Sequence, residues 1–264
     1  MRVFLAHCSN SILFTSLTRI IETIQNFAFF QTNSNGDLWG VSRLLTFDDE
    51  RVEMTLTCDP HFHQTDSWAD PQVLWGSVNW NPQAADPAEV AEHCSWDAAN
   101  TKACNFYNIK EGLIYLVHNA GGQIFPSLGG WTLSDAFPAM AASASSRANF
   151  ASQCVDLIKE YGFDGIDIDW EYPGYEEHSG TAADKENFNL LLDDVRAALD
   201  ALGAETGRYY PLTAALPCGP SHIGNIDIAH AATRLDELNL MTYDFGGSFS
   251  ATSSFNAPMV YQGW

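Results

Sequence analysis

Positively charged residues are scarce in this chain, and their scarcity limits the partners it can have. The 264 residues include 12 Lys and Arg against 33 Asp and Glu, which gives a formal net charge of -21 at pH 7. Such a surface repels nucleic acid and anionic membranes, so neither is expected as a partner. A neutral or cationic partner is favoured. A neutral polysaccharide would suit the 8 Trp, 9 Tyr and 16 Phe, because sugar faces pack on aromatic rings, although most of these rings are expected in the core.

Long apolar runs are also absent. No run approaches the roughly 18 to 20 residues that a membrane-spanning helix needs, which predicts that the chain is not an integral membrane protein. Residues 1–14 carry one early positive charge and several apolar side chains, but polar residues 7–11 interrupt them. No small-residue cleavage site follows, so the N-terminus leaves a secretory signal open without establishing one.

Internal repeats, low-complexity tracts and charge blocks are missing too, which predicts one domain. The absence of Gly-x-Gly-x-x-Gly and phosphate-loop patterns weighs against a nucleotide-binding open sheet. Metal-ligand clusters are scarce: His61 and His63 form a pair on a polar stretch without a third ligand, so no metal and no other cofactor is expected.

Strand and helix patterns alternate along most of the chain. We expect strands at residues 24–30, 122–128, 165–171, 210–216 and 238–243, and helices at 109–119, 145–161, 184–202 and 226–233. Gly162 and Gly203 are the predicted C-caps of the second and third helices. Apolar strands that alternate with helices indicate a parallel sheet joined by right-handed crossovers. The fold class is therefore α/β, as a (β/α)8 barrel or an open doubly wound sheet.

The six cysteines permit two interpretations. Their even number is compatible with disulfides, and Cys94 and Cys104 lie close enough in a loop-like stretch to pair. In a chain of this size the same residues could equally be buried thiols. Both interpretations stay open at this point.

A row of carboxylates is the strongest chemical signal. In the segment Asp164-Gly-Ile-Asp-Ile-Asp-Trp-Glu171, residues two apart share a face of a strand, so Asp167, Asp169 and Glu171 point one way. They are spaced about 6.6 Å apart at about 3.3 Å per residue. Two charges at that distance repel by about 2.5 kcal/mol at an effective dielectric near 20. A shared proton would relieve the repulsion.

This row permits three interpretations. Carboxylate-only sites suit calcium or magnesium, but calcium loops need turn geometry and glycine, whereas Ile and Trp intervene here. A structural polar network without catalysis is the second interpretation. Acid and base chemistry with separated pKa values is favoured, because Glu171 stands at the carboxyl end of its strand, where α/β barrels place catalytic groups.

The segment at residues 164–173 resembles the Asp-x-x-Asp-x-Asp-x-Glu signature of the chitinases of glycoside hydrolase family 18. Residues 126–134 (PSLGGWTLS) are similar to the Ser-x-Gly-Gly motif on the third barrel strand of that family, and residues 241–245 (MTYDF) to the Met-x-Tyr-Asp motif on the sixth. Residues 203–215 and 256–258 look like its bacterial and fungal type. The resemblance covers residues 24–264 and implies a (β/α)8 barrel.

The resemblance implies a retaining mechanism in which the N-acetyl group of the substrate replaces an enzyme nucleophile. Glu171 would protonate the glycosidic oxygen. Asp169 would orient the acetamido group and stabilise the oxazolinium intermediate, and Asp167 would share charge or a proton with Asp169. Tyr243 would hydrogen-bond the acetamide carbonyl. No cofactor is implied.

The remaining site residues implied by the resemblance contact the sugar or support the strands. Sugar contacts are expected from Asp244, Met241, Trp131, Tyr172, Gly129 and Gly130, and supporting roles from Asp164 and Ser127. The two glycines would leave room beside the catalytic strand. Trp131 could stack on a sugar or belong to the core. Taken alone, the glycine pair would be a turn and Tyr243-Asp244 a strand end, so only the set of motifs carries weight.

The pattern departs from the family at both ends. Residues 1–23 form a divergent segment, either a first strand or a poor signal, and the catalytic domain is expected at 24–264. The sixth strand ends near Tyr243, so strands seven and eight do not fit into residues 244–264. The barrel is therefore expected to be incomplete at its C-terminus, and its activity impaired by an open edge.

Two functions outside the leading one remain open. An endo-acting hydrolase of N-glycan cores would use the same catalytic strand, and the tryptophan-rich residues 75–80 favour chitin over it. A chitin-binding lectin on the same barrel would have lost catalysis, but lectin forms usually replace the acid that is present here as Glu171. The expected partners are chitin or chito-oligosaccharides. By resemblance, a secreted, extracellular monomer is expected.

Overall fold

A six-stranded sheet organises the computed structural model, which describes residues 24–40, 44–48, 51–55, 74–75, 94–96, 102–104, 110 and 112–259. Its strands lie in the order β10-β9-β8-β7-β1-β2. Five strands are parallel to one another, and β2 pairs with β1 in the antiparallel sense. Their bounds are Ile24–Thr32 for β1, Leu38–Gly40 for β2, Gln123–Gly129 for β7, Ile166–Asp169 for β8, Leu212–Pro217 for β9 and Glu237–Met241 for β10. The predicted parallel α/β sheet is confirmed.

Two strands end earlier than the sequence predicts. Strand β8 ends at Asp169, so Glu171 lies in the turn after the strand rather than in it. Strand β10 ends at Met241, which places Tyr243 and Asp244 beyond it, and Asp244 has a positive φ of 56°. In both cases the chain leaves the sheet just before the candidate site residues. Short strands therefore deliver the candidate site residues to one edge.

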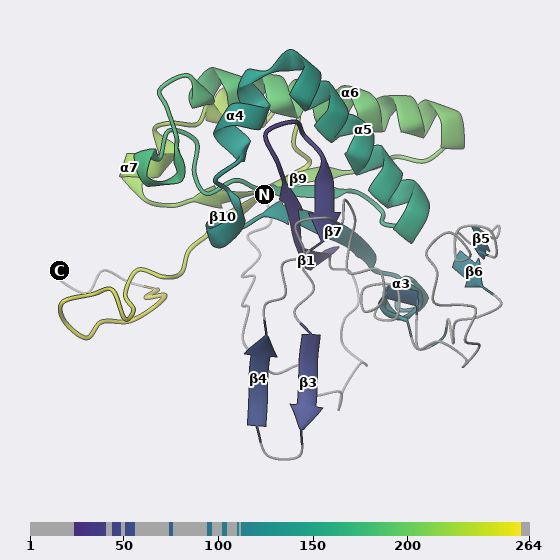
Figure 1. Cartoon of the computed structure of the whole chain (residues 1–264), viewed down its shortest axis with the longest axis horizontal. Helices are drawn as coiled ribbons and strands as arrows, with labels where there is room; N and C mark the ends of the chain where they lie inside the picture. Colours follow the sequence, from purple (N-terminus) through teal and green to yellow (C-terminus); the bar gives the residue numbers. More distant parts are fainter. Residues whose placement is uncertain are drawn as a thin grey trace.

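Helices cover one face of this sheet. Helices α4 (Phe137–Ala142), α5 (Ala144–Tyr161) and α6 (Asp184–Thr206) form a layer along it (Figure 1), and α3 (Leu113–Asn119), α7 (Pro220–Ile223) and α8 (Ile228–Ala231) are short. Two 3-10 helices, η3 (Trp131–Leu133) and η4 (Glu176–His178), follow β7 and β8. The expected helix at 226–233 is reduced to α8, while α4 and α7 were not predicted.

One predicted helix end is right and another is wrong. Helix α5 ends at Gly162, which has a left-handed φ of 84° as predicted. Helix α6 does not end at Gly203; it continues to Thr206 and is capped by Gly207 with φ 73°. At Gly203 an added Cβ would lie 2.6 Å from the main-chain oxygen of Arg208. Glycine is therefore needed there because the chain after α6 passes close to the helix.

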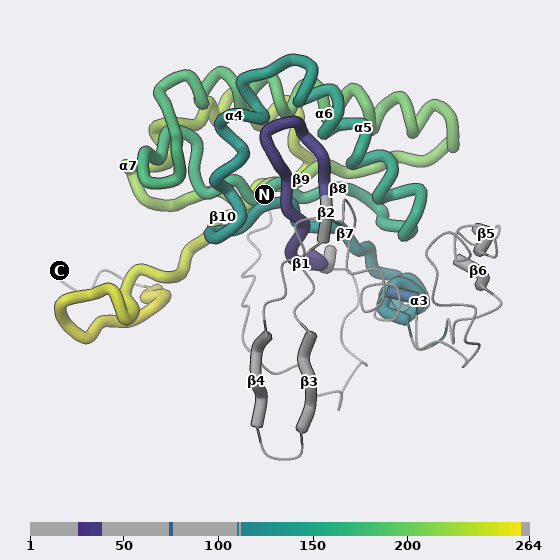
Figure 2. Tube along the Cα trace, in the orientation of Figure 1, coloured from purple at the N-terminus to yellow at the C-terminus, as the bar shows by residue number. Residues whose placement is uncertain are grey.

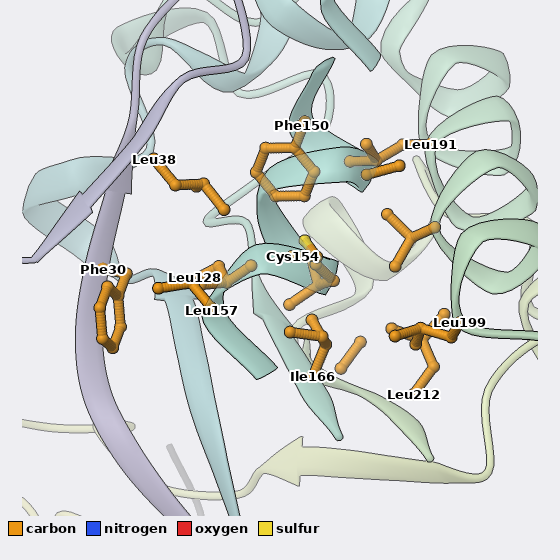
Figure 3. Close-up of a cluster of buried hydrophobic side chains, with 14 of the residues drawn as sticks. Phe30, Leu38, Leu128, Phe150, Cys154, Leu157, Ile166, Leu191, Leu199 and Leu212 are labelled. Atoms are coloured by element: carbon orange, nitrogen blue, oxygen red, sulfur yellow. The ribbon is translucent and has the colours of Figure 1, made fainter. Parts of the chain in front are cut away.

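The core lies between this helical layer and the sheet. Figure 3 shows side chains of α5, including Phe150, Cys154 and Leu157, facing those of α6 and of the strands. Trp170 points to the same side and packs on Phe137 with ring centroids 5.5 Å apart, which agrees with the predicted alternation along β8. Apolar side chains of β8 thus anchor the strand and leave its carboxylates on the opposite face.

Trp75 does not support the expectation that the tryptophan-rich residues 75–80 favour chitin over N-glycan cores. Its side chain is 2% exposed and stacks on Tyr161 of α5, with ring centroids 5.2 Å apart. The indole N–H also donates to the main-chain oxygen of Tyr161 at 3.2 Å. Trp75 is a core residue, and residues 76–80 lie outside the described part of the chain.

Two hairpins occur within the long segment for which no strand was predicted. Strands β3 (Leu44–Asp48) and β4 (Arg51–Thr55) pair with each other, as do β5 (Cys94–Trp96) and β6 (Lys102–Cys104). In the second hairpin Cys94 lies directly opposite Cys104 in the register. Directly opposed positions of antiparallel strands bring Cα atoms within the range that a disulfide spans. The Cys94–Cys104 disulfide therefore stays a prediction, to be checked by peptide mapping of the non-reduced chain.

Two sequence-based expectations concern residues that the structure does not describe. The divergent segment at residues 1–23 and the histidine pair His61 and His63 lie outside the described ranges. No helix in the described ranges is long and apolar enough to cross a membrane. Within the same ranges, no group of three His, Cys, Asp or Glu residues could hold a metal ion. Figure 2 follows the chain from β10 into the segment that leads to residue 259.

Candidate active site

Asp167 receives hydrogen bonds from every parallel strand other than its own. The hydroxyl of Ser127 on β7 donates to it at 2.8 Å, and the amide of Asn239 on β10 at 3.2 Å. Thr213 on β9 and Asn26 on β1 also hydrogen-bond to it. Burial raises the pKa of Asp167, and these donors oppose that rise. Donors around both oxygens suit a carboxylate that stays in a fixed orientation.

Asp169 is the neighbouring carboxyl on the same face, and its environment differs. It is 7% exposed, and its Oδ1 atom has no hydrogen-bond partner among the described residues. Burial raises the pKa of Asp169 well above its ordinary range, and the negative charges of Glu171 and Asp167 add to the rise. Of the three carboxyls in this row, Asp169 is the one whose ionised form is most disfavoured. Its free oxygen can receive a substrate group.

The main chain of Glu171 is held on both sides. Its N–H donates to the hydroxyl of Ser134 at 2.9 Å, and that hydroxyl in turn donates to the carbonyl of Gly130 at 2.9 Å. The carbonyl of Glu171 accepts a hydrogen bond from Nδ1 of His178 at 2.7 Å. These contacts connect the ends of β7 and η4 to Glu171, so its side chain leaves from a fixed point.

The carboxyl group of Glu171 is half-buried and carries donors suited to its ionised form. The hydroxyl of Tyr172 and the main-chain N–H of Trp131 both donate to it. Burial is the largest influence and raises the pKa of Glu171, and Asp244 raises it further, while the two donors and His178 lower it. The net shift is upward, which is the direction that a general acid requires. Once deprotonated, the carboxylate meets donors already in place.

Gly129 and Gly130 allow β7 to approach the end of β8. Gly129 has a φ of 116°, and an added Cβ would lie 2.2 Å from the main-chain oxygen of Asp169. The N–H of Gly130 donates to that same oxygen at 2.7 Å. At Gly130 an added Cβ would lie 3.0 Å from the ring of Phe29. Glycine is therefore required by close approach of the two strands, as well as by backbone conformation.

Gly129→Ala is expected to lower the free energy of unfolding by about 3 kcal/mol, because both the positive φ and the contact with Asp169 oppose a Cβ. Gly121 is a matched control: its φ is 77°, but nothing lies within 4 Å of an added Cβ. Gly121→Ala should cost about 1 kcal/mol. Urea unfolding measures both variants, and equal losses would show that the contact with Asp169 contributes nothing.

Aromatic side chains surround Trp131 next to Glu171. The indole of Trp131 is 48% exposed, which rules out the core role that the sequence left open. Its ring centroid lies 4.5 Å from that of His178, 5.6 Å from Tyr175 and 6.2 Å from Tyr172. Tyr172 is itself stacked on His222 of α7 at 4.7 Å. Burial and the Glu171 charge raise the pKa of Tyr172, so its hydroxyl remains a donor.

Residues after β10 reach the same region. Asp244 lies close enough to raise the pKa of Glu171, and its carboxylate accepts from the amide of Asn256 at 2.6 Å. Tyr243 lies close enough to Tyr172 to raise its pKa. Met241, the last residue of β10, is partly buried. The structure thus brings these three residues to the edge of the sheet that carries Glu171.

Asp164 lies at the opposite end of β8 from Glu171. Its carboxylate accepts hydrogen bonds from Arg208 at 2.9 Å and from the N–H of Ile124 at 2.9 Å, and His118 lies 2.8 Å away. Asp164 is 3% exposed. These partners come from β7, α3 and the segment before β9, so Asp164 fixes elements at the amino end of the sheet and does not reach the carboxylate row.

Five supporting residues were not predicted from the sequence: Ser134, His178, Thr213, Asn239 and Asn26. Thr213 lies opposite Asp167 in the register of β8 and β9. The period of two would have placed Thr213 on the same face as Asp167 once the register was known. Ser134 and His178 act through main-chain atoms of Glu171, and no side-chain pattern signals such contacts.

Known proteins resemble the chain along most of its length. The model of the family described as Glycosyl hydrolases family 18 matches residues 23–263. Chitinase A1 of Niallia circulans is 32% identical over 229 residues, covering 74% of this chain and 32% of that protein. Endochitinase 1 of Metarhizium robertsii is 39% identical over 173 residues, covering 64% of this chain and 39% of that protein. Among solved structures, chitinase ChiA74 from Bacillus thuringiensis is 30% identical with a TM-score of 0.59, covering 89% of this chain and 37% of that chain.

Proposed function

The chain belongs to family 18 of the glycosyl hydrolases, and from this membership we propose that it is a chitinase cleaving β-1,4 linkages between N-acetylglucosamine units. The family has the (β/α)8 barrel fold, to which the described parallel strands contribute. One observation carries the proposal. Glu171, with its raised pKa, stands at the carboxyl end of β8 next to Asp169, whose buried Oδ1 has no partner among the described residues. Glu171 can therefore act as an acid, and the free oxygen of Asp169 can accept a hydrogen bond from the substrate.

The reaction proceeds by retention of configuration with help from the substrate. Glu171 gives its proton to the glycosidic oxygen as the bond from that oxygen to C1 breaks, and the acetamide oxygen of the same sugar bonds to C1. The products of this step are the leaving sugar and a cationic oxazolinium. The Glu171 carboxylate, stabilised by Tyr172 and Trp131, then takes a proton from water as the water oxygen attacks C1. The acetamide is released and Glu171 is protonated again.

Asp169 and Asp167 serve the acetamide. Asp169 orients the acetamide N–H through its unpartnered oxygen and stabilises the positive oxazolinium as its own proton shifts toward Asp167. The donors around Asp167 hold its carboxyl in a fixed orientation while negative charge develops on Asp169. Tyr243 donates to the acetamide carbonyl. The mechanism needs no metal or other cofactor.

The substrate contacts and supporting roles complete the proposal. Sugar contacts come from Trp131, Tyr172, Asp244, Met241, Gly129 and Gly130, and supporting contacts from Ser127 and Asp164. The exposed indole of Trp131 suits stacking on a pyranose face. The partners are chitin or chito-oligosaccharides, bound by a catalytic domain at residues 24–264 that acts as a monomer. Because the substrate is an extracellular polymer, the protein acts outside the cell.

Release of a fluorophore from aryl glycosides of chitobiose and chitotriose tests the proposal. The anomer formed first is recorded by proton NMR, and the β-anomer is expected because the configuration is retained. First formation of the α-anomer would contradict the substrate-assisted mechanism. Binding to chitin beads without turnover of any substrate would contradict a chitinase and indicate a lectin.

A further inference from the structure

The loop between β8 and α6 is tied to the first residue of α6. Asp184 is 1% exposed and accepts hydrogen bonds from the N–H of Gly174 at 3.0 Å and from the N–H of Thr181 at 2.9 Å. The Thr181 hydroxyl donates to its other oxygen at 3.1 Å. The loop therefore has a defined path between these anchors. It carries η4, whose last residue is His178.

His178 makes two different contacts from this loop. Its Nδ1 lies 2.7 Å from the main-chain oxygen of Glu171. A carbonyl oxygen can only accept, so Nδ1 must carry the hydrogen. The other contact is with Trp131, at a ring centroid distance of 4.5 Å and an interplanar angle of 57°. Tyr175 packs edge-on against the imidazole at 5.2 Å, which restricts its rotation.

These contacts close a ring of interactions between Trp131 and Glu171. The main-chain N–H of Trp131 donates to the carboxyl of Glu171, while its indole packs on the histidine that holds the carbonyl of Glu171. The indole is nevertheless 48% exposed, so part of its surface is free. An exposed aromatic ring that neighbouring side chains hold in place offers a rigid surface for a sugar.

We propose that His178 is a positioning residue that aligns both the Glu171 acid and the Trp131 indole, one through its Nδ1–H and the other through its ring. This role rests on the proposed chitinase function and deepens it. His178 contacts no substrate itself. Its N–H fixes the main chain from which the acid reaches the glycosidic oxygen, and its ring fixes the indole on which a more distant sugar of the same oligosaccharide stacks.

Two substitutions separate the two contacts. His178→Asn keeps an amide donor near the position of Nδ1 but removes the ring, and His178→Phe keeps a ring but removes the donor. We expect His178→Phe to lower kcat about tenfold on both an aryl chitobioside and chitohexaose, with KM within about twofold. We expect His178→Asn to retain kcat within about twofold and to raise KM for chitohexaose about five- to tenfold.

His230 provides the matched control. It is a partly exposed histidine on α8 whose Nε2 lies 3.0 Å from Asp193, and the same two substitutions there should leave kcat and KM unchanged for both substrates. Circular dichroism and thermal unfolding show whether each variant is folded. Equal losses of kcat and equal rises of KM in both His178 variants would indicate a general packing role and overturn the proposal, as would no effect in either.

A measurement without turnover distinguishes failure of this role from failure of the proposed function. Long-range nitrogen–proton NMR of the neutral imidazole should show the proton of His178 on Nδ1, and a proton on Nε2 would overturn the donor role. Titration of tryptophan fluorescence with chitohexaose should show weaker binding in His178→Asn than in His178→Phe. A chain that shows the proton on Nδ1 and the weaker binding in His178→Asn, but no turnover, would contradict the chitinase function and leave the positioning role supported.

Discussion

Glu171→Gln should lower kcat on chito-oligosaccharides by about 10³-fold while leaving KM nearly unchanged. The amide keeps the shape of the side chain, so contacts with Tyr172 and Trp131 are largely retained, but it cannot deliver a proton to the glycosidic oxygen. General acid catalysis by a positioned side chain contributes about 10² to 10⁴-fold. Steady-state kinetics with chitohexaose measure both constants, and unchanged thermal unfolding would show that the fold is retained.

Glu205 supplies the control for this substitution. It is exposed on α6, where it forms an ion pair with Lys159 at 3.2 Å, and Glu205→Gln should leave kcat unaltered. In the unsubstituted chain the protonated form of Glu171 is the active one. Because the pKa of Glu171 is raised, kcat should persist to higher pH than an ordinary carboxyl allows and then fall as the proton is lost. Turnover by Glu171→Gln within tenfold of the unsubstituted chain would remove Glu171 from the acid role.

The parallel sheet and the carboxylate row could be predicted because both depend on local periodicity. Alternation along residues 164–171 predicts that Ile166 and Ile168 face away from Asp167 and Asp169. In the structure the two isoleucines belong to the apolar core, whereas Asp167 contacts polar side chains of the neighbouring strands. The glycine pair after β7 could be recognised from its motif. Strand ends were less predictable: Glu171 and Tyr243 lie beyond the ends of β8 and β10. The main chain of Glu171 is held there by Ser134 and His178, which belong to other segments.

The missed residues depend on distances between segments that a single sequence does not contain. Ser134 and His178 hold the main chain of Glu171 from two different loops. Asn239 reaches Asp167 across two strand spacings, which requires knowledge of the sheet order and the register. Gly203 misled the prediction of a helix end, because a glycine that permits close approach looks the same in sequence as one that caps a helix.

Asp169→Asn should lower kcat by about 10²-fold and yet raise stability at neutral pH. The activity falls because asparagine cannot offer negative charge to the cationic intermediate. The effect on stability follows from the raised pKa of Asp169. Above a pH of about 4 an unfolded chain has lost this proton, whereas the folded chain retains it to higher pH. The contribution of Asp169 to folding stability is therefore fully present at low pH and is lost as pH rises. Asparagine does not ionise, so Asp169→Asn does not suffer this loss.

The sign of this stability change separates a catalytic carboxyl from a structural one on the same strand. Asp169→Asn should raise the midpoint of thermal unfolding at pH 7, with the gain disappearing at pH 3. Asp164→Asn should instead lower the free energy of unfolding by about 2 kcal/mol at pH 7, because it removes the charge that Arg208 and the N–H of Ile124 contact. A loss of stability at pH 7 in Asp169→Asn would mean that partners stabilise the ionised form of Asp169, and would contradict its role as the carboxyl that holds a proton until the oxazolinium forms.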